Sequence, residues 1–144
     1  MADEFLQESE VRYFEVKGEY YGKNCLPSLN NLIHEAERNP HAYNRLKKQM
    51  EYVVINAIRR YLKGWKASKR VRLTYEFGEK AKGQKRDYDN VSGASSKIIS
   101  DALVKSGTLH DDAPKYVAPS IYTFKYTDGI PYVRVWIEEV GDAK

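Results

Sequence analysis

The stretch that decides the fold is Lys85–Asp112, which reads KRDYDNVSGASSKIISDALVKSGTLHDD. Its apolar residues recur three and four positions apart, which is the period of a helix with one buried face. These residues are Val91, Ala94, Ile98, Ile99, Ala102 and Leu103. Asp89 or Asn90 can cap such a helix at its start, and Gly107 is typical of a helix end. The pattern therefore predicts a helix over 89–106.

The segments before this helix carry signals of two strands and two further helices. A run of β-branched and aromatic residues predicts a first strand, and Ser28 can cap a helix that follows it. The pair Asn39–Pro40 is a strong start signal for a longer helix, which Gly64 ends. A strictly alternating strand comes next. In chain order, the predicted elements are a strand over Val11–Lys17, a helix over Leu29–Glu37, a helix from Pro40 to Gly64 and a strand over Val71–Phe77.

After the helix, the sequence predicts two more strands. The first lies within Tyr116–Tyr126 and the second over Ile130–Val140, and Asp128–Gly129 between them is the strongest short hairpin signal in the chain. The order of elements indicates an α+β domain with a small mixed or antiparallel sheet of about four strands packed against helices. We expect one domain over residues 1–144, with residues 1–9 disordered.

Composition is that of a soluble globular protein. Hydrophobic residues make up 42% and charged residues 31% of the chain, and no apolar run is long enough to span a membrane. The acidic N-terminus lacks the layout of a signal peptide, so we expect a cytoplasmic protein without a membrane partner. One cysteine excludes an internal disulfide, and three scattered histidines argue against a zinc site.

Positive charge gathers before and around the predicted helix. The net charge is only +4, but the lysines and arginines are clustered. A basic surround offsets the repulsion between phosphates and an acidic site, so it favours binding of nucleic acid. The alternative is a solvated helix face followed by an ordinary basic loop. The candidate DNA-binding residues are Lys69, Arg70, Lys80, Lys82, Lys85 and Arg86.

Four aspartates flank the predicted helix. Asp87 and Asp89 are two residues apart, so an extended backbone places both carboxylates on one face. Asp111 and Asp112 follow the helix, and they can join the first pair if the helix folds back. Such a cluster suits a hard divalent cation such as Mg²⁺, which would activate water against a phosphodiester. The alternative is a capped helix with surface charges.

The order of these pieces resembles the RusA family of crossover junction endodeoxyribonucleases, found in phages and prophages. The resemblance is carried by K-R-D-x-D-N, then K-x-x-x-D-A-L-x-K-x-G, then x-D-D, all within Lys85–Asp112. It extends upstream to LPSLNNLIHEAERNPHAYNRLKKQ. The resemblance implies a RusA-like fold and a homodimer in the bacterial host cell. It also implies a nuclease that cuts four-way (Holliday) DNA junctions with Mg²⁺, or with Mn²⁺ as a substitute.

The resemblance also assigns roles to single residues. By position, Asp87, Asp89 and Asp112 match the family's essential carboxylates, Lys97 matches its functional lysine, and Asp111 lies beside the third acid. These residues are therefore the expected catalytic and metal-binding set.

The spacing around Lys97 differs from that of the family. The segment VSGASS separates Asn90 from Lys97; it is about four residues longer than in the best-known members, and four residues are about one helical turn. Either Lys97 keeps its facing one turn further along the axis, or the helix starts late. Lys97 can also contact Asp101, four residues on. Two other functions stay open: a phage protein that binds branched DNA without catalysis, and a structural or interaction protein.

Overall fold

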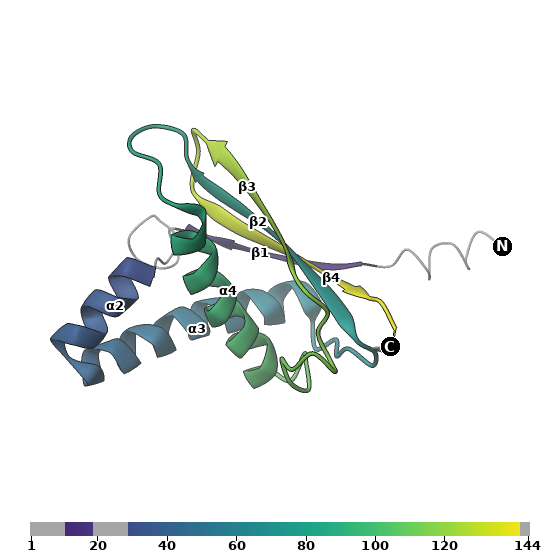
Figure 1. The fold of residues 1–144 in the computed structure, drawn as a ribbon. Helices are drawn as coiled ribbons and strands as arrows, with labels where there is room; N and C mark the ends of the chain where they lie inside the picture. The colour runs from purple at the N-terminus through teal and green to yellow at the C-terminus, as the bar shows by residue number, and fades with distance from the viewer. Residues whose placement is uncertain (1–10, 19–28, 142–144) are drawn as a thin grey trace.

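The computed structural model describes residues 11–18 and 29–141, which form a mixed sheet covered by helices (Figure 1). The elements are β1 (Arg12–Lys17), α2 (Leu29–Arg38), α3 (Pro40–Leu62), β2 (Val71–Lys80), α4 (Tyr88–Lys105), β3 (Ile121–Thr127) and β4 (Tyr132–Glu139). The predicted α+β class, with about four strands, is confirmed. The predictions for residues 1–9 and for Ser28 lie outside the described residues. No helix in the described ranges is long and apolar enough to cross a membrane.

The longest helix, α3, begins as the sequence predicts. The side-chain oxygen of Asn39 accepts hydrogen bonds from the backbone N–H groups of His41 and Ala42, at 2.9 and 3.4 Å. Pro40 occupies the first helical position, where its missing N–H group costs no hydrogen bond. The helix ends two residues before Gly64.

The strand order in the sheet is β1-β4-β2-β3. Strand β4 pairs antiparallel with both β1 and β2, whereas β3 pairs parallel with β2. Because β2 separates β3 from β4, the predicted hairpin at Asp128–Gly129 is wrong.

The physical reason is the length of the connection between β3 and β4. Four residues separate Thr127 from Tyr132, and an extended chain of that length spans up to about 17 Å. Two strand spacings amount to only about 9.6 Å, so the chain crosses the end of β2. The N–H group of Ala81, just after β2, donates to the carbonyl of Thr127 at 2.9 Å and continues the pairing of these strands.

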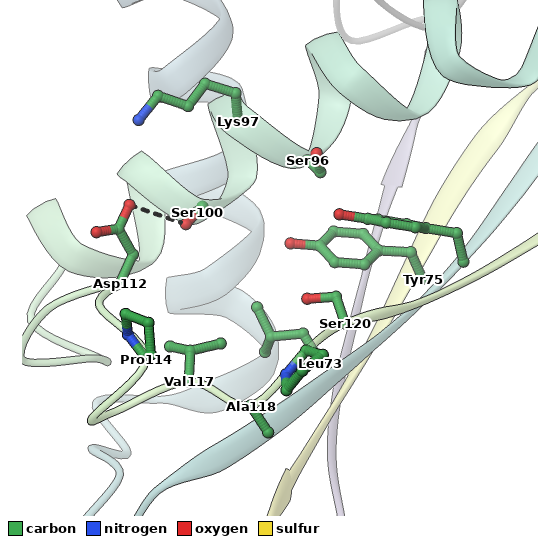
Figure 2. A pocket seen from close by; sticks show the side chains of 12 residues that line it. Leu73, Tyr75, Ser96, Lys97, Ser100, Asp112, Pro114, Val117, Ala118 and Ser120 are labelled. Carbon is green, nitrogen blue, oxygen red and sulfur yellow. Dashed lines mark hydrogen bonds between the residues drawn. The ribbon is translucent and has the colours of Figure 1, made fainter.

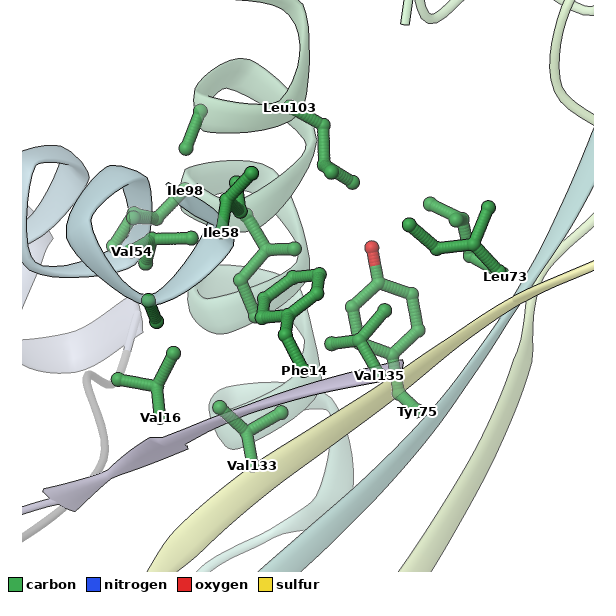
Figure 3. Packing of buried hydrophobic residues seen from close by; sticks show 14 of the residues in the cluster. Phe14, Val16, Val54, Ile58, Leu73, Tyr75, Ile98, Leu103, Val133 and Val135 are labelled. Carbon is green, nitrogen blue, oxygen red and sulfur yellow. The ribbon is translucent and has the colours of Figure 1, made fainter. Parts of the chain in front are cut away.

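The hydrophobic core lies between the sheet and helices α3 and α4 (Figure 3). Alternate residues of β1, β2 and β4 are buried on this side of the sheet: Phe14, Val16, Leu73, Tyr75, Phe77, Val133, Val135 and Ile137. Helix α4 contributes Val91, Ala94, Ile98, Ile99, Ala102 and Leu103. Each large apolar side chain contributes about 1.5–3 kcal/mol on burial. Helix α4 is therefore held along most of its length, and its two ends have defined positions on the sheet.

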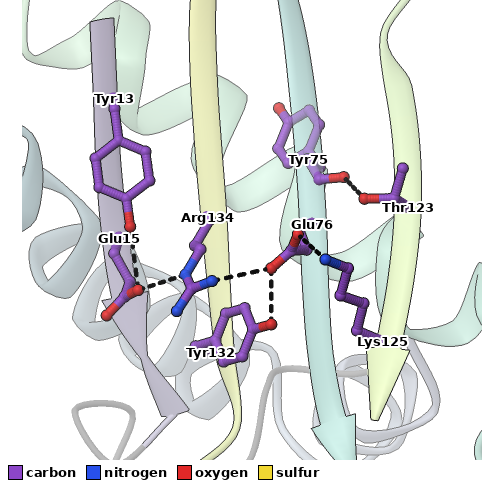
Figure 4. A network of polar contacts seen from close by, with 8 residues as sticks. All are labelled: Tyr13, Glu15, Tyr75, Glu76, Thr123, Lys125, Tyr132 and Arg134. Atoms are coloured by element: carbon purple, nitrogen blue, oxygen red, sulfur yellow. Dashed lines mark hydrogen bonds and ion pairs between the residues drawn. The ribbon is translucent and has the colours of Figure 1, made fainter. Parts of the chain in front are cut away.

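The opposite face of the sheet carries a charged network (Figure 4). Glu76 lies at its centre, 7% exposed. Its carboxylate accepts a hydrogen bond from the hydroxyl of Tyr132 at 2.7 Å and lies 3.2 Å from both Arg134 and Lys125. Arg134 also donates to Glu15 at 2.7 Å. The guanidinium of Arg134 therefore joins two carboxylates across neighbouring strands.

These contacts shift the ionisation of Glu76 and Tyr132. Burial alone would raise the pKa of Glu76, but hydrogen bonds from Tyr132 and Lys125, together with the charges of Lys125 and Arg134, outweigh burial and lower the pKa. Burial and the neighbouring Glu76 carboxylate raise the pKa of Tyr132 to about 12. At neutral pH the network therefore contains an ionised Glu76 and a neutral Tyr132.

Candidate active site

The first pair of predicted acids lies at the start of α4. Asp87 is the N-cap residue, with an extended backbone (φ −63°, ψ 142°), and its side chain makes no capping hydrogen bond. The helix begins at Tyr88, so the prediction that Asp89 or Asn90 caps it is wrong. Asp89 lies in the first helical turn, so the argument that an extended backbone aligns the two carboxylates does not apply here.

Both carboxylates of this pair are available to a ligand. Asp87 and Asp89 are exposed, and neither side-chain carboxylate has a hydrogen-bond or ion-pair partner within residues 11–18 and 29–141. The partial positive charge at a helix start favours carboxylates at these positions. The pair is therefore held by the backbone while its oxygen atoms stay free.

The segment between β2 and α4 supplies four of the predicted cations. Lys80, Lys82, Lys85 and Arg86 line a cavity of about 240 Å³. Arg86 is held by both oxygen atoms of Glu79, at 2.7 Å each. The ammonium group of Lys85 donates to the carbonyl of Ala81 and lies 5.0 Å from the ring centre of Tyr126. This segment therefore places positive charge directly before the acids of the helix start.

The second pair of acids follows α4 and folds back along it. The hydroxyl of Ser100 donates to Asp112 at 3.5 Å, and the N–H group of Asp112 donates to the Asp111 carboxylate at 2.7 Å. Lys97 lies 3.1 Å from Asp101, so the predicted contact between these residues is confirmed.

Lys97 lies on an unbroken helix. Helix α4 runs from Tyr88 through the segment VSGASS, so a late helix start is excluded. The hydrogen bond and charge of Asp101, followed by the charge of Asp112, raise the pKa of Lys97. Lys97 is therefore a cation that carboxylates stabilise near the middle of α4.

Lys97 and Asp112 share a cavity of about 380 Å³ (Figure 2). Hydroxyl groups of Ser96, Ser100 and Ser120 also line it, together with the buried Tyr75. Burial raises the pKa of Tyr75 well above its usual value, so its hydroxyl stays protonated. The cavity combines a cation, a carboxylate and several hydroxyl groups.

The structure does not bring Asp112 to the acids of the helix start. Asp112 contacts Ser100, which is eleven residues along α4 from Asp89, and the helical rise makes this about 16 Å. In the described part of the chain, no group of three or more His, Cys, Asp or Glu side chains is placed to hold a metal ion. Magnesium is usually held by one or two carboxylates plus substrate phosphates. Asp87 and Asp89 therefore fit in ligand number and type, without Asp112.

Lys69 and Arg70 lie at the other end of β2. They line a cavity of about 450 Å³ with His110 and Lys115, and Arg70 donates to the carbonyl of Pro114 at 2.9 Å. Strand β2 has ten residues, so it spans about 30 Å. The predicted site residues therefore form two groups. The helix-start group is Asp87, Asp89, Lys80, Lys82, Lys85 and Arg86; the helix-end group is Asp111, Asp112, Lys97, Lys69 and Arg70.

The sequence interpretation missed the aromatic residues beside the helix-start group. Tyr122, Phe124 and Tyr126 alternate along β3, and this alternation predicted only a strand. The strand order places β3 at the outer edge of the sheet, and Tyr88 of α4 stacks on Phe124 at 4.3 Å between ring centres. Only the pairing of β3 with β2 could show that Tyr126 lies next to Lys85.

No protein-family model matches the chain, and no curated protein matches it significantly in sequence. Function is therefore inferred from the residues, their geometry and the order of motifs within Lys85–Asp112.

Proposed function

We propose that the chain is a metal-dependent endodeoxyribonuclease of the RusA type that resolves four-way DNA junctions in the bacterial cytoplasm. The helix-start group carries this proposal. Two exposed carboxylates without partners, Asp87 and Asp89, directly follow a cationic segment. Phosphodiester hydrolysis needs oxygen ligands for a hard cation and positive charge for the flanking phosphates, and this group offers both.

In this function, Asp87 and Asp89 would hold Mg²⁺ or Mn²⁺. The bound metal would activate water and neutralise charge on the leaving oxygen. Lys82 and Lys85 bind phosphates on either side of the cut bond. Arg86, which donates to Glu79 through Nε and Nη2, adds positive charge at the start of α4.

A branched DNA substrate is consistent with the separation between the helix-start group and the helix-end group. At the helix start, Tyr88 stacks on Phe124, which is the β3 partner of Phe77. Phe77 lies seven residues beyond Arg70 in an extended chain, about 23 Å, so one chain contacts two well-separated stretches of DNA backbone. A homodimer provides two such sites for opposed strands. Because these contacts are to phosphates, junction affinity should fall steeply with salt.

The test is cleavage of a labelled four-way junction and a matched duplex, with and without Mg²⁺. Symmetric nicks should occur on the junction alone and only with metal. Asp89→Asn should lower the rate at least about a hundred-fold and keep junction binding, because it removes a ligand charge at constant size. Asp112→Asn is the matched control and should lower the rate less than about ten-fold, since it lies outside the helix-start group.

Circular dichroism of the variants separates chemistry from folding. If Asp89→Asn loses its fold along with its activity, Asp89 is structural and the proposed site is wrong. If Asp112→Asn is as inactive as Asp89→Asn while both bind and fold, the two acids act in one site.

A second candidate is a protein that binds branched DNA without cutting it. The separation of Asp112 from Asp89 favours it, because the three carboxylates that the RusA family is expected to use do not meet here. Tight junction binding without nicks in Mg²⁺ or Mn²⁺ would support this candidate. A chain with no preference for junctions over duplex at moderate salt would instead be an interaction protein.

A further inference from the structure

An aromatic strip lies along the outer edge of the sheet. It consists of Tyr122, Phe124 and Tyr126 of β3 and Tyr88 of α4. Side chains alternate along a strand, so the three β3 rings share one side. Strand β3 pairs with β2 alone, and its second edge has no neighbouring strand in the described chain. Within the strip, Phe124 is partly covered by Tyr88, whereas the three tyrosines are exposed.

Three rings of the strip pack on the core or on one another. Tyr122 lies 5.3 Å from Tyr75, and Phe124 lies 5.2 Å from Phe77, measured between ring centres. Tyr88 stacks on Phe124 at 4.3 Å, with 29° between the ring planes. These contacts hold one face of the strip rigid before any ligand binds.

The tyrosines of the strip nevertheless stay about half exposed. The exposed fractions are 57% for Tyr88, 45% for Tyr122 and 43% for Tyr126. Single exposed apolar residues are ordinary on protein surfaces. Three exposed rings gathered on one strand and the adjoining helix start are more than scattered single exposures, and gathered apolar surface is typical of interaction sites.

Cations lie at one end of the strip. The Lys85 ammonium group lies 5.0 Å from the ring centre of Tyr126, and Lys80 and Lys82 line the same cavity as that ring. Aromatic rings beside lysines are the combination that binds unpaired nucleic acid strands, because bases stack on the rings while phosphates meet the cations. Bases inside a duplex are already paired and stacked, so they cannot use such a surface.

We propose that the aromatic strip binds the unpaired bases of a DNA strand. The choice of DNA, and of a branch point as the source of unpaired bases, rests on the proposed function. Tyr88 lies between Asp87 and Asp89 in the chain. Bases stacked on the strip therefore guide their strand toward the helix-start group.

The test compares two labelled oligonucleotides of about twelve nucleotides: an oligothymidylate and an abasic strand of equal length. Both carry the same phosphate charge, but only the first has bases. Fluorescence anisotropy with the 144-residue protein, without metal, measures both affinities. The protein should bind the oligothymidylate at least about five-fold more tightly, which corresponds to one stacked base.

Substitutions then locate the effect. Tyr122→Leu and Tyr126→Leu should each reduce this ratio, because leucine keeps an apolar side chain but has no ring. Tyr126→Phe should retain the ratio. The matched control is Tyr52→Leu, since Tyr52 is an exposed tyrosine on α3, away from the strip; its ratio should not change.

Equal affinity of the unmodified protein for the two strands would overturn the proposal, even where a leucine variant does not fold. A ratio that survives in both folded leucine variants would overturn it too. Because neither metal nor cleavage enters this assay, the two proposals fail separately. Junction nicking with equal oligonucleotide affinities would reject the strip and keep the nuclease. Base-dependent binding without nicking would reject the nuclease and keep the strip.

Discussion

The charged network on the face of the sheet opposite the hydrophobic core gives a quantitative prediction for Glu76. Glu76→Gln keeps the size of the side chain but removes the negative charge that Arg134 and Lys125 share, each 3.2 Å away. Hydrogen bonds to a charged group contribute about 1.5–3 kcal/mol, against about 0.5–1.5 kcal/mol for neutral pairs. The side chains of Arg134 and Lys125 are 39% and 65% exposed, so solvent screens their charges. We therefore expect the free energy of unfolding at pH 7 to fall by about 2 kcal/mol.

The size of this loss should depend on pH in one direction. The pKa of Glu76 is lowered in the folded protein from its usual value of 4.5. The ionised carboxylate therefore stabilises the fold fully above that usual value, and its contribution disappears as the pH falls through the lowered folded pKa. Glutamine does not titrate. The difference between the two proteins should be full at pH 7 and shrink below about pH 4.5.

Urea unfolding curves at pH 7 and at about pH 3 measure both effects. The control is Glu138→Gln on the neighbouring strand β4. Glu138 is exposed and has no charged partner in the described ranges, so its replacement should change the free energy by less than about 0.5 kcal/mol. Equal stability of Glu76→Gln and the unmodified protein at pH 7 would refute the reasoning, as would a difference that persists unchanged at low pH.

Three further predictions concern other positions. A Cβ atom at Gly78 would lie 2.1 Å from the ring of Tyr132, so Gly78→Ala should lower the free energy of unfolding by about 1–3 kcal/mol in urea curves; no loss would mean that the ring yields freely. Burial and neighbouring carboxylates raise the pKa of Tyr13 and of Tyr132 to about 12, so an absorbance titration should show these two among the tyrosines that ionise late, and Tyr13→Phe and Tyr132→Phe should each remove one late step. Their stabilising contribution is full below about pH 10 and is lost as the pH rises to about 12. Lys97→Met removes the ion pair with Asp101, in which the lysine side chain is 63% exposed. The free energy of unfolding should therefore fall by less than about 1 kcal/mol in urea curves. A larger loss would mean that the pair is effectively buried.

Local sequence signals predicted α3 and β2 well. The start of α3 depends on Asn39 and Pro40, which act on backbone groups within a few residues of themselves. The alternation in Val71–Phe77 predicted the apolar side chains of β2 that are buried against the helices, but it did not predict that Glu76, on the other face, is buried as well. Local signals did not predict which strands pair with each other. Asp128–Gly129 reverses the chain, but a turn signal does not state whether the returning strand pairs with the one before it or crosses to the far side of β2.

The residue types of the candidate site were predicted, but their separation was not. Helix α4 has eighteen residues, so its ends are about 27 Å apart. The chain after α4 returns along the helix only a short way, because Leu109 is buried and its N–H group bonds the carbonyl of Leu103 at 3.1 Å. That contact places Asp112 beside Ser100. The sequence shows an apolar residue at 109 but does not show which turn of the helix it packs against.

Whether Asp89 and Asp112 act together can be decided by the additivity of their effects. Substitutions more than about 10 Å apart, with no shared partner, usually add in free energy within about 0.3–0.5 kcal/mol. Ser100, which contacts Asp112, lies about 16 Å along α4 from Asp89. The fold-losses in junction cleavage rate caused by Asp89→Asn and Asp112→Asn should therefore multiply in the double variant to within about two-fold. A large departure from that product would mean that both carboxylates act in one shared site, as the RusA-like order of motifs implies. Agreement with the product would leave Asp87 and Asp89, with the lysines before them, as the site of the chemistry.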